Sequence, residues 1–150
     1  MKIVIPGILA AALGMLSISL AGNGNAAARS GFSLASLKGS YAGKFSGNID
    51  AGGDLLPFHG IGIFVSDGKG NLSGHETYTV DITPCEASIS GTYTIDADGS
   101  GTNAVTFTTS SPGCTSGSYT QGLAIAQRGK EILLSNTNGD QVSEEWHLQQ

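Results

Sequence analysis

The chain has few of the features that most functional classes require. Charged residues make up 13% of its 150 residues, and seven Lys and Arg face twelve Asp and Glu. No basic cluster offsets this acidic balance, which argues against nucleic-acid binding because phosphate backbones are repelled. The sequence also contains no glycine-rich phosphate loop, no Gly-x-Ser-x-Gly elbow and no His-Glu-x-x-His pair. We therefore predict that the protein uses no cofactor.

Cysteine is scarce as well, with Cys85 and Cys114 as the only pair. In an exported protein, two cysteines are first interpreted as one disulfide. Each follows a turn-like sequence that contains a proline, Pro84 or Pro112. We expect the two cysteines at one end of the fold, where they form a disulfide. A catalytic thiol is the alternative, and no neighbouring base in the sequence supports it.

Histidine, at three residues, is too sparse to suggest a metal site. Alternation of side chains places His59 and His75 on opposite faces of one predicted hairpin, and His147 on the face opposite Trp146. The acidic segment 96–101 resembles the first half of a calcium-binding loop, but it lacks the closing glutamate and the flanking helices. We interpret that segment as a hairpin turn and predict no metal site.

The N-terminal segment has the composition of an export signal. Lys2 supplies a positive charge, an apolar run follows at 3–20, and three alanines end the segment at Ala28. Signal peptidase accepts small residues at such a site, so we predict a signal peptide at 1–28 that is cleaved after its last alanine. A membrane anchor is the alternative, although the apolar run is close to the shortest that spans a bilayer. We expect a secreted or periplasmic protein, with no membrane attachment after cleavage and a single domain at 29–150.

Period-two alternation, interrupted by Gly, Asp, Asn and Pro, dominates the remainder of the chain. It predicts one short helical turn at 33–37 and then eight strands, at residues 39–49, 58–66, 71–82, 87–96, 102–109, 117–127, 130–136 and 141–149. The strand connections are short, and Gly-containing turns at 66–71, 96–101 and 138–140 are typical of antiparallel hairpins.

Eight consecutive antiparallel strands favour one architecture. We predict an all-β fold, a single antiparallel up-and-down β-barrel, because closure removes exposed strand edges. Glycines within the strands are also typical of a small barrel, in which strands bend sharply. A two-sheet β-sandwich is the alternative.

Strand alternation then indicates which polar side chains point inward. A two-residue turn at Gly68 and Lys69 would pair Ile61 with Glu76, with Ile61, Ile63 and Val65 on the inner face of their strand. Glu76 would then enter the apolar interior. A slip of one residue would place it outside.

The same reasoning applied to the other strands gives a set of candidate ligand-binding residues. Trp146 marks the inner face of the last strand, which Glu144 shares. The full set is Glu76, Tyr78, Glu144, Tyr41, Tyr119 and Gln121. A buried carboxyl group without a partner is costly, so it usually has a function or lies near water. The alternative is that both glutamates lie at the barrel rims in solvent.

Three segments resemble a group of small exported bacterial proteins of unassigned function. They are Leu-Lys-Gly-Ser-Tyr-Ala at 37–42, Phe-x-x-Asp-Gly-x-Gly at 64–70, and the Gly-x-Tyr-x-Ile segment with its Asp-Gly-x-Gly turn at 91–101, which has one extra residue before Asp98. The resemblance implies a lipocalin-like or allene-oxide-cyclase-like barrel. It implies no catalytic residue, because fold does not determine function.

Our leading prediction is an exported barrel that binds a small, partly apolar ligand in its interior. One alternative is a cofactor-free isomerase or cyclase that uses Glu76 or Glu144 with a tyrosine, and a carboxyl group hydrogen-bonded to a tyrosine hydroxyl would favour it. A structural or surface protein with a filled interior is the other alternative. The sequence leaves the ligand and the oligomeric state open.

Overall fold

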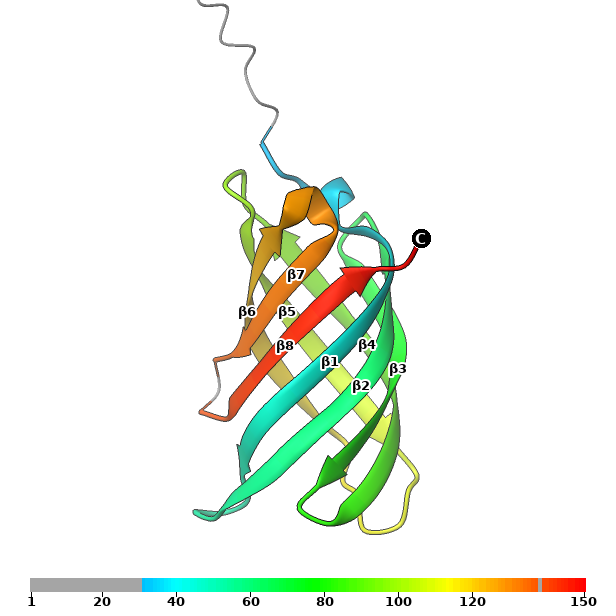
Figure 1. The fold of residues 1–150 in the computed structure, drawn as a ribbon, viewed down its shortest axis with the longest axis vertical. Coiled ribbons are helices and arrows are strands. Elements are labelled where there is room, and N and C mark those ends of the chain that lie inside the picture. Colours follow the sequence, from blue (N-terminus) through cyan, green and yellow to red (C-terminus); the bar gives the residue numbers. More distant parts are fainter. Residues whose placement is uncertain (1–30, 138) are drawn as a thin grey trace, which may run out of the picture.

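The chain forms a closed barrel of eight antiparallel strands, each paired with its neighbours in sequence, and β1 closes the barrel against β8 (Figure 1). The computed structural model describes residues 31–137 and 139–150, so the predicted signal peptide at 1–28 lies outside the described residues. The strands are β1 Lys38–Asp50, β2 Leu55–Asp67, β3 Asn71–Val80, β4 Thr83–Ile95, β5 Ser100–Thr109, β6 Gly117–Ala126, β7 Glu131–Asn136 and β8 Gln141–Leu148. The predicted up-and-down barrel is confirmed, and the sandwich alternative is excluded.

The turn between β2 and β3 has three residues, where the sequence predicted two. Gly68 and Gly70 adopt positive φ angles of 74° and 104°, which glycine tolerates without strain. The Asp67 carboxylate holds the turn by accepting the backbone N–H of Lys69 at 2.6 Å. The extra turn residue shifts the pairing by one, so Glu76 lies opposite Gly62 and the predicted pairing with Ile61 is wrong.

The inner face of β2 also differs from the prediction. Ile61 and Val65 are exposed, while Phe64 is buried and stacks on Trp146 with ring centroids 4.4 Å apart. Aromatic rings fill this narrow interior, so β2 presents glycines beside them: a Cβ atom on Gly62 would lie 2.9 Å from the Phe64 ring. The apolar alternation of β2 therefore marks its outer face. The error in face and the error in register cancel, and Glu76 points inward as expected.

The histidines lie on the outside of the barrel. His59 and His75 are both exposed on the same face of the hairpin, so the prediction that they occupy opposite faces is wrong. The cause is again the extra turn residue, which shifts the pairing of β2 with β3 by one. His147 points outward and pairs with Glu145 at 2.7 Å. Within residues 31–137 and 139–150, no group of three or more His, Cys, Asp or Glu could hold a metal ion.

One end of the barrel is closed by a packed core. The short 3-10 helices η1 Leu34–Leu37 and η2 Gln127–Gly129 lie at this end, which is the upper end in Figure 1. Leu37 is fully buried there, and the Tyr93 hydroxyl donates a hydrogen bond to the carbonyl of Leu34 at 3.0 Å. Neither of these helices is long and apolar enough to cross a membrane.

The opposite end carries the disulfide. Cys85, near the start of β4, is bonded to Cys114 in the β5–β6 connection, and their Cα atoms are 6.1 Å apart. The expected position at one end of the fold is confirmed, although Cys85 lies within a strand and not in a turn. A smaller apolar cluster around Phe45 and Tyr78 packs beside the disulfide. This cluster does not fill the barrel.

Candidate functional site

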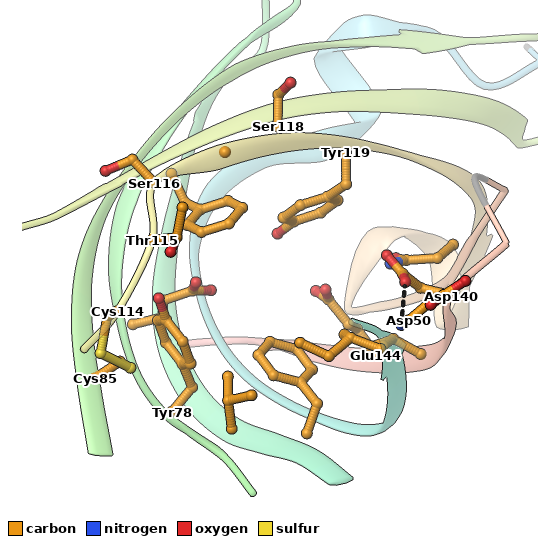
Figure 2. Close-up of a pocket in the computed structure, with 18 of the residues that line it drawn as sticks. Asp50, Tyr78, Cys85, Cys114, Thr115, Ser116, Ser118, Tyr119, Asp140 and Glu144 are labelled. Atoms are coloured by element: carbon orange, nitrogen blue, oxygen red, sulfur yellow. Dashed lines mark hydrogen bonds between the residues drawn. A yellow bond between two sulfur atoms is a disulfide. The ribbon is translucent and has the colours of Figure 1, made fainter. Parts of the chain in front are cut away.

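A cavity of about 330 Å³ opens into the barrel at the disulfide end (Figure 2). The residues that line it come from all eight strands, although β7 contributes only its last residue, and from the connections at this end. They are Ile49, Asp50, Phe58, Glu76, Tyr78, Val80, Cys85, Phe107, Gly113, Cys114, Thr115, Ser116, Gly117, Ser118, Tyr119, Asn136, Asp140, Val142 and Glu144. The volume is at the small end of the range for ligand pockets in proteins.

Glu76 is the most unusual side chain of the cavity. It points inward from β3 and is only 4% exposed, and no hydrogen-bond partner for its carboxyl group is found among the described residues. Burial, together with the nearby Glu144, raises the pKa of Glu76 from 4.5 to about 8. Removal of the carboxylate from water disfavours its charged form, and a second carboxylate in the same space adds to that effect.

Glu144 on β8 is buried too, but it has partners. The Gln121 side-chain amide donates to one of its oxygens at 2.6 Å, and the Trp146 indole N–H donates to the other at 3.0 Å. Burial raises the pKa of Glu144 to about 7, and these two hydrogen bonds limit the rise. Gln121 extends this network, because its amide also donates to Asn136, which lines the cavity, and its carbonyl accepts from the buried Asn103.

Two of the predicted tyrosines project into the same space. Tyr78 from β3 and Tyr119 from β6 lie on different walls of the cavity, with Glu144 on a third (Figure 2). Burial raises the pKa of both tyrosines, and the neighbouring carboxylates raise it further. Both hydroxyls therefore stay protonated at neutral pH and are able to donate hydrogen bonds into the cavity.

The other two predicted residues lie elsewhere. Gln121 is fully buried beneath the cavity, where it orients Glu144, and it is not part of the cavity wall. Tyr41 belongs to the closed-end core, where its hydroxyl donates to the carbonyl of Gly129 at 3.0 Å. The structure thus brings together Glu76, Tyr78, Tyr119 and Glu144, and leaves Tyr41 apart.

The mouth of the cavity was not foreseen from the sequence. Asp50 at the end of β1 and Asp140 before β8 meet there, with the backbone N–H of Asp50 donating to the Asp140 carboxylate at 3.0 Å (Figure 2). Phe58 and Phe107 complete the apolar wall. Asp50 and Asp140 lie at or next to strand ends, where alternation carries no signal, so only their closeness to the predicted strand ends at 49 and 141 could have indicated them.

The site combines an apolar wall with acidic and hydroxyl groups. Among the described lining residues there is no Lys, Arg or His, whereas Asp50, Glu76, Asp140 and Glu144 are acidic. Such an arrangement can accept hydrogen bonds from a ligand, and two of its carboxyl groups titrate near neutral pH. It offers no described positive group to hold an anion.

No protein-family model matches the chain, and no curated protein matches its sequence. Among solved structures, the chain is similar to a redesigned β-barrel, mFAP1, whose structure was determined bound to DFHBI. The two chains are 13% identical, the match covers 77% of this chain and 97% of that chain, and the TM-score is 0.48. At this level of similarity the comparison says nothing about what this chain binds.

Proposed function

We propose that this protein is an exported barrel that binds a small, partly apolar ligand in the cavity at its disulfide end. The observation that carries the proposal is the uneven filling of the barrel. One half is packed with Trp146, Phe64 and Tyr41, while the other retains about 330 Å³ next to a buried, unpartnered Glu76. A protein that served only as a structural unit would gain stability by filling this space.

An enzymatic role is supported less well. The pKa values of Glu76 and Glu144, near 8 and 7, suit general acid–base chemistry at neutral pH. However, a hydrogen bond between a tyrosine hydroxyl and one of these carboxyl groups would favour an isomerase or cyclase, and no such bond is present among the described residues. Binding without chemistry remains the proposal.

Titration with the neutral dye N-phenyl-1-naphthylamine tests this function, because its fluorescence rises in apolar surroundings. We expect saturable binding with one site per barrel. Val80 lines the cavity, and Val80→Phe should weaken dye binding by about tenfold or more, because the larger ring occupies the site. Val65→Phe is the matched control, since Val65 is exposed on the outer face of β2. Equal dye binding by the two variants, or no saturable binding by the wild type, would contradict the proposal.

A further inference from the structure

We infer that the cavity selects a ligand that carries a protonated amine on an aromatic or otherwise apolar body. The inference rests on the proposed binding function and specifies its ligand class. Its basis is the charge of the wall: four carboxyl groups, Asp50, Glu76, Asp140 and Glu144, face the cavity or its mouth, and the described lining residues include no basic side chain. A negative wall of this kind attracts cations and repels anions.

Glu76 supplies the second, independent observation. Its side chain is more than nine-tenths buried and points into the cavity, yet the described residues give it no hydrogen bond. A buried polar group without a partner is costly and is normally satisfied in proteins. An ammonium group in the cavity would provide both the donor and the opposite charge that Glu76 lacks, in a charge-assisted hydrogen bond.

Glu144 completes the acidic half of the site. Its two protein donors, Gln121 and Trp146, are neutral, so they orient the carboxylate without cancelling its charge. A carboxylate has about four lone-pair positions, and two remain for a ligand. Glu76 from β3 and Glu144 from β8 thus approach the ligand from different walls, which suits a primary or secondary ammonium with more than one N–H.

The aromatic side chains of the cavity favour the same ligand. Tyr78 lies between Phe58 and Phe107, with ring centroids 5.4 Å and 6.4 Å away. Tyr119 continues the group, 6.0 Å from Phe107. Aromatic faces attract cations through the ring quadrupole and stack on a flat apolar body. The cavity therefore provides separate places for the charge and for the body of such a ligand.

The titration of the site supports this inference. Tyr78, Tyr119, Glu144, Asp50 and Asp140 face the same space as Glu76, and none of them brings a positive charge. The pKa of Glu76 near 8 means that an ammonium ligand would displace a proton from this carboxyl group at neutral pH. Binding of the amine should therefore strengthen as the pH rises toward 8, while the amine itself remains protonated.

Three probes of similar shape test the inference by isothermal calorimetry and by displacement of N-phenyl-1-naphthylamine. They are 1-naphthylmethylamine, which is cationic, 1-naphthylmethanol, which is neutral, and 1-naphthoate, which is anionic. At pH 8 we expect the amine to bind at least about tenfold more tightly than the alcohol, and the carboxylate to bind most weakly. Glu76→Gln should remove most of the preference for the amine over the alcohol, and Glu144→Gln should reduce it. Glu86→Gln, the same change on an exposed residue of β4, should leave it intact.

The outcomes separate this inference from the proposed function. If amine and alcohol bind equally, or if both Glu76→Gln and Glu144→Gln retain the preference, the cation inference is wrong and the ligand-binding function stands. If neither the dye nor any probe binds, the proposed function fails and this inference fails with it.

Discussion

Glu76 shows how much depends on a single side chain in this barrel. The carboxyl group faces a cavity that is lined by aromatic, hydroxyl and other acidic side chains, and it has no described hydrogen-bond partner. At low pH it is a neutral acid and its burial costs little. Once ionised, it carries a charge that the protein does not compensate, so the same group connects ligand recognition to the pH dependence of folding.

We predict that Glu76→Gln flattens the dependence of stability on pH. The pKa of Glu76 is about 8 in the folded protein against an ordinary value of 4.5. Between these values the folded protein holds a proton that the unfolded chain has released, so the contribution of Glu76 to stability falls as the pH rises from about 4.5 to about 8. In thermal melts, the melting temperature of the wild type should fall between pH 5 and pH 8. This fall should be smaller in the variant by about 5 °C or more. Glu86→Gln should behave like the wild type. Equal losses in all three proteins would show that Glu76 is solvated in the folded protein.

At the scale of elements, the hairpins were the most predictable part of the fold. Each strand begins and ends within a few residues of the positions predicted from alternation, and Asp-Gly sequences mark the β2–β3 and β4–β5 turns. The register of β2 on β3 was less predictable, since one extra residue in the Gly68–Gly70 turn shifts every pair. The face of β2 was assigned wrongly, because Ile61 and Val65 are apolar yet exposed, while glycines face the crowded interior. Hydrophobicity alone cannot show that an interior has room only for glycine beside a Phe64–Trp146 stack.

The disulfide joins two elements at the mouth of the cavity, and its loss should affect both stability and binding. The Cys85–Cys114 bridge closes a sequence separation of 29 residues, which by chain entropy contributes about 3–4 kcal/mol. We expect the double variant Cys85→Ala, Cys114→Ala to lose about that much stability in denaturant titrations. It should also bind the dye more weakly, because residues 113–118 line the cavity. Reduced wild-type protein, which keeps both sulfur atoms, is the matched comparison. Unchanged unfolding midpoints in both would contradict the prediction.

At the scale of the whole molecule, the closed barrel was predictable because short turns leave consecutive antiparallel strands few other arrangements. The cavity was not. Its volume depends on how far the packed core extends from the end that carries η1, and that depends on contacts such as Tyr41 with Trp146, whose ring centroids are 6.3 Å apart. The inward position of Glu144 was predictable from Trp146 on the same strand, whereas the hydrogen bonds that hold it were not.

The predicted signal peptide can be tested by expressing the full chain and identifying the first residue of the exported protein. If the segment 1–28 is a signal peptide, expression of the full chain in a bacterial host should yield exported protein that begins at Arg29. The disulfide at Cys85 and Cys114 is typical of proteins in a non-reducing compartment, and thiol titration of the exported fraction under denaturing conditions should find no free thiol. Mass spectrometry of the intact protein measures the first residue. A chain that begins at Met1 in the exported fraction would contradict the signal-peptide prediction.

Because β1 pairs with β8, the barrel is closed and none of its strands is an edge strand. The backbone N–H of Gln149 donates to the carbonyl of Ser40 at 2.8 Å, so the two ends of the barrel-forming chain run side by side at the closed end. A circular permutant that joins these ends and opens the chain at a hairpin turn would keep all eight ladders. The choice of turn would decide whether the new termini flank the cavity mouth or lie on the far side of the barrel.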